Sequence, residues 1–107
     1  MSDALSALEG LYVFMTSNLA ALQAAFPADP EKSRLMSLYV AARTSYWKCV
    51  DATFHDDDPA ITALVTQMNA QQATIAAEVA AMNDVGKILN AITSAVQIGA
   101  RLASLGA

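Results

Sequence analysis

The chain has 107 residues, of which 55% are hydrophobic and 15% charged, and its formal net charge is -4. This length suits one domain, residues 1–107, and the apolar fraction excludes a disordered chain, which lacks the apolar surface that offsets ordering entropy. The acidic balance and the scatter of the six Lys and Arg residues argue against a nucleic-acid partner, which requires clustered cations.

The first predicted element is a helix over residues 2–25. Apolar residues recur at alternating spacings of three and four, which places them on one stripe of an α-helix: Leu5, Leu8, Tyr12, Met15, Leu19, Leu22 and Phe26. Leu11 and Phe14 widen this stripe, as is typical of a helix that contacts two neighbours in a bundle.

A second helix is predicted over residues 30–54. Asp29 suits the N-cap and Pro30 the first helical position, and the short connection favours an antiparallel hairpin. The residues expected to face inward are Leu35, Leu38, Tyr39, Ala42, Tyr46, Cys49, Val50 and Phe54.

An aspartate followed by a proline also predicts the start of a third helix, over residues 59–82, with Asp58 as the N-cap and Pro59 at the first helical position. Its stripe again alternates spacings of four and three: Ile61, Val65, Met68, Gln72, Ile75, Val79 and Met82. Gln72 is the single polar residue in that register.

Beyond Met82 the sequence leaves two possibilities, because Val85 and Leu89 continue the helical period without a proline. Residues 59–105 could form one rod of roughly 70 Å. Alternatively, the chain breaks at Asn83 with Asp84 as a cap, and a fourth helix covers residues 84–105. The break is slightly favoured. The predicted fold class is therefore all-α, an antiparallel three- or four-helix bundle whose last two helices are possibly one long helix.

The C-terminal half is nearly uncharged, with four charged side chains in residues 59–107. An uncharged helix face can pack against another helix, so the last helix is the predicted contact surface for a second copy or another protein. The interface residues on this interpretation are Val85, Ile88, Leu89, Ile92, Ala95, Val96, Gly99, Leu102 and Leu105. A Leu89→Asp change would then split the complex and spare the fold. The small residues four apart around Gly99 are better explained by ordinary packing within the chain.

Catalytic, metal and cofactor sites are not predicted. Asp51 and His55 could share a helix face near Asp56–Asp58, but capping of the next helix explains that acidic run better than a metal does. Cys49 and His55 lie six apart, which places them on different faces of a helix, so Cys49 is expected to be a buried structural thiol. Trp47 is either a boundary residue under a neighbouring helix or a surface anchor for a partner, and the boundary position is favoured.

These patterns favour a non-enzymatic protein-interaction or assembly module that forms a homo-oligomer through the last helix. A translocated or membrane-active helical protein of a bacterial secretion-type machine is one alternative, although membrane binding is not favoured because the last segment has only two cations. A bundle that binds a small ligand beside Tyr39, Tyr46 and Met68 is another. With no signal peptide or membrane span predicted, the expected location is cytoplasmic, and non-classical export stays open.

Overall fold

The chain forms four helices in a computed structural model that describes residues 3–52, 54–55, 57–81 and 84–105, with the side chain of Val85 also outside the description. The helices are α1 (Asp3–Ala25), α2 (Glu31–Cys49), α3 (Pro59–Ala81) and α4 (Val85–Leu105). Among the described residues all regular structure is helical, which confirms the all-α bundle.

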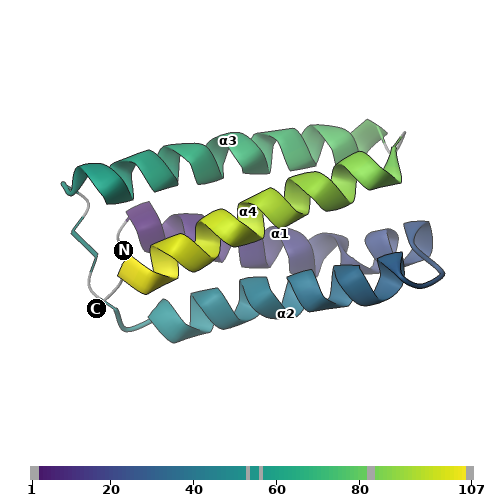
Figure 1. The fold of residues 1–107 in the computed structure, drawn as a ribbon, viewed down its shortest axis with the longest axis horizontal. Coiled ribbons are helices and arrows are strands. Elements are labelled where there is room, and N and C mark those ends of the chain that lie inside the picture. Colours follow the sequence, from purple (N-terminus) through teal and green to yellow (C-terminus); the bar gives the residue numbers. More distant parts are fainter. Residues whose placement is uncertain (1–2, 53, 56, 82–83, 106–107) are drawn as a thin grey trace.

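The helices are arranged around the bundle in the order α1, α2, α4, α3, which differs from their order in the chain (Figure 1). The hairpins α1–α2 and α3–α4 are antiparallel, and α4 packs on α2, α3 and α1. Arg34 joins α2 to α4 by donating to Asn90 Oδ1 at 3.3 Å and to Thr93 Oγ1 at 2.9 Å. In the described part of the chain α2 does not contact α3, and these two helices lie on opposite sides.

This arrangement explains why α2 ends five residues earlier than the sequence suggests. The predicted helix 30–54 is wrong at its C-terminal end, because the helix stops at Cys49 and Ala52 N–H donates to the Cys49 carbonyl in a turn. The chain must then cross the end of the bundle to reach α3. Phe54 lies in that crossing segment and is still buried, so its predicted core position is correct although it is not helical. Val50, predicted to face inward, is exposed.

The break after α3 is confirmed, and the single rod over residues 59–105 is wrong. The whole bundle measures 41 × 22 × 19 Å, which suits helices of 19 to 23 residues at about 1.5 Å per residue. Asp84 Oδ1 accepts a hydrogen bond from Lys87 N–H at 3.2 Å, as predicted for the cap of α4. The predicted core residue Met82 and the break residue Asn83 lie outside the described residues.

The other two caps use the predicted aspartates. Asp58 Oδ1 accepts from Ala60 N–H at 2.8 Å at the start of α3. Asp29 Oδ1 accepts from both Ser33 N–H and Ser33 Oγ, and these bonds lower the pKa of Asp29 below its ordinary value. The predicted start of α2 is one residue too early, because Pro30, and not Asp29, occupies the N-cap position and the helix begins at Glu31.

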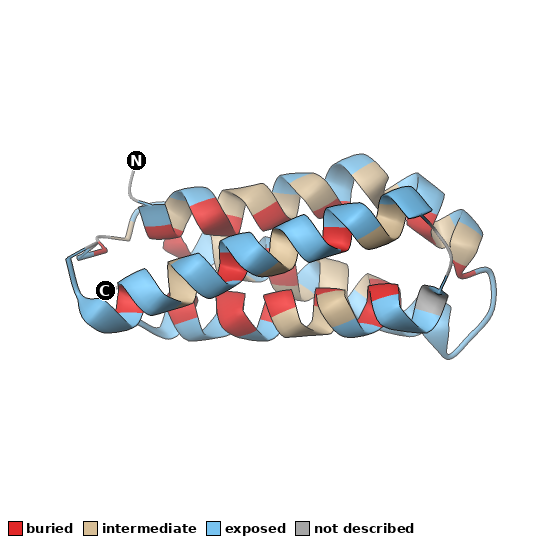
Figure 2. Ribbon diagram, turned by 90° about the horizontal axis from the view of Figure 1, so that it is seen from above, coloured by how far each residue is buried: buried red, intermediate tan, exposed pale blue. Residues whose placement is uncertain are grey.

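Buried residues recur along all four helices (Figure 2), and they form one hydrophobic core cluster. Most of the predicted stripes are inside, including Leu8, Met15, Leu35 and Met68, and no buried charged or polar residue is found within the described part. Gln72 is half-buried, and its Nε2 donates to the Ala7 carbonyl at 3.0 Å, so the single polar break in the α3 stripe serves as a bridge to α1.

Candidate functional site

The predicted interface on the last helix lies in the core of its own chain, which corrects its assignment as an exposed contact surface. The buried members are Ile88, Leu89, Ile92, Ala95, Val96, Gly99 and Leu102, whereas Leu105 is 45% exposed and the side chain of Val85 is outside the described part. The physical reason is that α4 has three helical neighbours, so its apolar face is covered without a second copy.

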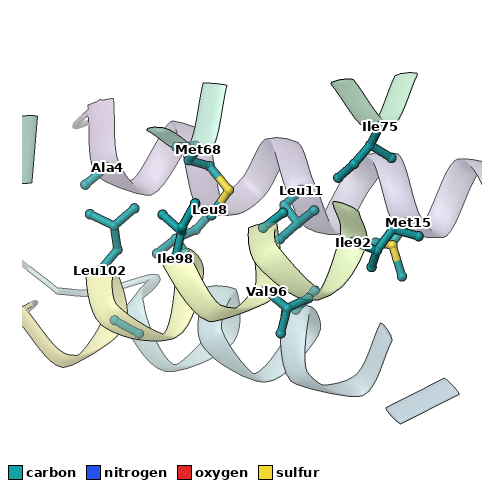
Figure 3. Packing of buried hydrophobic residues seen from close by; sticks show 14 of the residues in the cluster. Ala4, Leu8, Leu11, Met15, Met68, Ile75, Ile92, Val96, Ile98 and Leu102 are labelled. Carbon is teal, nitrogen blue, oxygen red and sulfur yellow. The ribbon is translucent and has the colours of Figure 1, made fainter. Parts of the chain in front are cut away.

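The small residues of α4 allow that packing to be close. Figure 3 shows α4 against Leu8 and Met68. A Cβ atom at Gly99 would lie 3.2 Å from Met68 Cε and 3.4 Å from Leu8 Cδ2. Gly99 therefore sits where α1, α3 and α4 approach each other, which confirms packing within the chain as the role of this residue.

A cluster of four aromatic rings joins α1 to α2. The Tyr12 ring stacks on Tyr46 with centroids 5.5 Å apart and on Tyr39 at 6.4 Å, and it meets Trp47 at 6.5 Å in an edge contact. Tyr46 and Trp47 are themselves 5.5 Å apart. Pairs at these separations contribute about 0.5–1.5 kcal/mol beyond the area that they bury.

Two groups of opposite charge border this cluster. The Arg43 guanidinium lies 5.9 Å from the centroid of the Tyr39 ring, within the range of a cation–π interaction. The Tyr46 hydroxyl donates to Glu9 Oε2 at 2.9 Å. This hydrogen bond is the main reason why the pKa of Tyr46 is raised above its ordinary value.

The cluster reaches the surface through Trp47, whose side chain is 56% exposed. The expectation that a neighbouring helix covers it is therefore wrong. Val40, one residue after Tyr39, and Val13, one residue after Tyr12, are also exposed. We call the four rings, Tyr12, Tyr39, Tyr46 and Trp47, the aromatic surface. The sequence showed the aromatic residues of α2, but their junction with Tyr12 depends on how the two helices pair in space.

The predicted ligand pocket is not formed. Met68 is fully buried against Gly99, whereas Tyr39 and Tyr46 lie at the α1–α2 seam, so the three residues do not share a cavity. Cavities are found instead between α1 and α3, where Asp3, Asn69 and other polar side chains line a hollow of about 380 Å³. This region was not singled out in the sequence.

Cys49 is the buried thiol that the sequence predicted, with 1% of its surface exposed. Its Sγ donates weakly to the Ala103 carbonyl of α4 at 3.8 Å. Burial raises the pKa of Cys49 above its ordinary value, although the neighbouring Lys48 acts in the opposite direction. The thiol is thus kept protonated, a state that suits a structural role and not a nucleophile.

We expect Cys49 to react with Ellman's reagent at least about tenfold more slowly in the native protein than in the urea-unfolded chain at pH 8, because reaction needs both opening and ionisation. The contrast should persist at pH 9, where the unfolded thiol is largely ionised. Absorbance at 412 nm follows the reaction. Equal rates in the two states would contradict the buried position.

The described residues contain no group of three or more His, Cys, Asp or Glu side chains that could hold a metal ion. His55 is exposed in the crossing segment, and Asp58 is engaged as a cap. Two segments, Asp3–Ala25 and Gly86–Leu105, are long and apolar enough to cross a membrane, but core helices of soluble proteins share that property and both segments contribute to this core.

Comparison with known proteins identifies no relative of this chain. The chain matches no protein-family model, no curated protein and no solved structure.

Proposed function

We propose that this protein is a non-enzymatic interaction module that self-associates side by side through its aromatic surface. One observation carries this proposal: more than half of Trp47 is exposed, although it belongs to a cluster of four rings beside a cation. Trp, Tyr and Arg are the residues that most often dominate binding energy in protein interfaces.

The distribution of exposed apolar side chains favours the α1–α2 hairpin, and not the last helix, as the site of contact. Among the described residues the large hydrophobic side chains that are exposed are Val13, Val40, Trp47, Val50 and Leu105. All but Leu105 belong to α1, to α2 or to the residue that follows α2. Their concentration on one hairpin is the pattern expected of a contact surface, because single scattered hydrophobic residues need no explanation.

The border of the aromatic surface favours a second copy as the partner. A symmetric dimer uses the same patch on both subunits, so the patch must complement itself. Glu9 and Arg43 supply opposite charges next to the rings. Across a two-fold axis, Glu9 of each copy can face Arg43 of the other. A surface with one sign of charge would repel itself.

The test is the absolute mass of the protein by light scattering on a sizing column, over about a hundredfold range of concentration. We expect a concentration-dependent rise in mass for the natural sequence. Trp47→Ser should weaken association at least about tenfold, because loss of a central aromatic anchor commonly costs 2 kcal/mol or more. The variant should stay folded by far-ultraviolet circular dichroism, although loss of the Trp47 ring contacts with Tyr12 and Tyr46 costs about 1–3 kcal/mol and lowers the unfolding midpoint in urea.

Leu105→Ser is the matched control, because Leu105 is also exposed but belongs to α4 and not to the aromatic surface. It should associate like the natural sequence. Dissociation by Leu105→Ser and not by Trp47→Ser would place the contact on α4 instead. A monomer at every concentration up to about 1 mM would overturn self-association altogether.

A further inference from the structure

All three tyrosines and the single tryptophan of the chain belong to the aromatic surface. Phenols and indoles are the aromatic side chains that lose one electron most readily. Trp47 is 56% exposed, whereas Tyr12, Tyr39 and Tyr46 are half-buried. An oxidising radical in the solvent therefore meets the Trp47 ring first.

The four rings are close enough for an electron to pass between them. The ring centroids of Trp47 and Tyr46 are 5.5 Å apart, and those of Trp47 and Tyr12 are 6.5 Å apart. At such separations neighbouring rings touch along their faces or edges, so no intervening group is needed for electron transfer. Trp47 thus has two phenols beside it as electron donors.

A proton acceptor distinguishes Tyr46 from Tyr12. A phenol that loses an electron also loses its hydroxyl proton, because the phenol radical cation is a strong acid. The Tyr46 hydroxyl donates to Glu9 Oε2 at 2.9 Å, a distance at which a side chain accepts a proton directly. The same hydrogen bond raises the pKa of Tyr46 above its ordinary value, so the proton is still in place before the electron leaves.

We propose that the aromatic surface is a one-electron relay, in which an oxidising radical takes an electron at Trp47 and the unpaired electron comes to rest on Tyr46. The direction is favourable because, at neutral pH, a phenol whose proton can leave is oxidised more easily than an indole. The transfer takes place within one chain, so it does not depend on self-association.

The relay has two steps. First, the oxidising radical removes one electron from the Trp47 indole and is reduced to its anion, and the indole N–H proton passes to water. The Trp47 radical then takes one electron from Tyr46 and one proton from water, while the Tyr46 O–H bond breaks and its proton moves to Glu9 Oε2. The products are an intact Trp47, a neutral Tyr46 phenoxyl radical and a protonated Glu9 carboxyl group.

The test is pulse radiolysis of the full-length protein with the azide radical, which oxidises indole faster than phenol, at a concentration at which light scattering gives a monomer. We expect the absorption of the indolyl radical to decay in a first-order step as that of the phenoxyl radical grows. Glu9→Gln keeps an oxygen that accepts from the hydroxyl but does not take its proton, so this step should slow at least about tenfold. Tyr46→Phe should slow it by at least about as much.

Tyr39→Phe is the matched control, because Tyr39 belongs to the same surface but stacks on Tyr12 at 6.4 Å. Its rate should equal that of the natural sequence, and circular dichroism checks that each variant is folded. An indolyl radical that persists, or that decays faster at higher protein concentration, would overturn the relay. An unchanged rate in Glu9→Gln would overturn the role of Glu9, and equal losses in Tyr39→Phe and Tyr46→Phe would overturn Tyr46 as the end point.

Discussion

Replacement of Leu89 by aspartate should unfold the protein. Leu89 is 1% exposed in the core between the helices, where a carboxylate has no partner. A buried, unpaired charge and the loss of a leucine side chain together cost more than about 4 kcal/mol, a large share of the 5–15 kcal/mol that stabilises a typical domain. Loss of the far-ultraviolet circular dichroism signal at 25 °C, or a midpoint in urea close to zero, would record this result.

Leu105→Asp is the comparison for that variant, because it places the same charge on the same helix at a residue that is 45% exposed. Its free energy of unfolding should stay within about 1 kcal/mol of the natural value. A folded Leu89→Asp protein with a lower mass in light scattering would instead support the expectation from the sequence that this leucine joins two copies.

Met68→Ala should destabilise the fold by about 2–5 kcal/mol, because it leaves a cavity where three helices meet. Met68 is fully buried, and its Cε lies 3.2 Å from the position that a Cβ at Gly99 would take. Urea unfolding followed by circular dichroism gives the change in free energy, with the slope against denaturant unchanged if only the native core is affected.

Met36→Ala makes the same chemical change at a half-buried position of α2, where the sulfur accepts from Gln23 Nε2 at 3.3 Å. It should cost less than half as much as Met68→Ala, because the Met36 side chain buries less apolar surface when the protein folds. Equal costs for the two variants would contradict the position of Met68 at the centre of the core.

The sequence predicted the helices well because two physical signals agree. The spacing of Leu8, Met15 and Leu22 fits only the helical period, and the proline-containing turns near residues 30 and 59 separate the helices. The end of α2 was predicted poorly because it depends on the distance that the chain must cover to reach α3. That distance depends on how the helices are arranged in space, which the spacing of apolar residues does not predict.

The predicted interface failed for a related reason. An apolar face shows that a helix is covered, but it does not say whether the cover comes from the same chain. For Ile88, Ile92 and Leu102 the cover is the chain's own helices. The aromatic residues of α2 were visible in the sequence, but their contact with Tyr12 was not predicted. Tyr12 was assigned to the core stripe of α1, and only the antiparallel pairing of the two helices brings its ring to Trp47.

The order of the helices in space also orients any pair of bundles that associate. Because α1 and α3 are parallel, their positive N-terminal dipoles lie side by side. Asp3, Asp51, Asp57 and Asp58 lie at that end of the molecule, and Lys48 and Arg101 near the ends of α2 and α4 offset only part of their charge. Two copies packed side by side in parallel would bring these acidic ends together. An antiparallel pair separates them by nearly the 41 Å length of the bundle, several times the screening distance of about 8 Å in physiological salt. Electrostatics therefore favours a dimer whose subunits run in opposite directions.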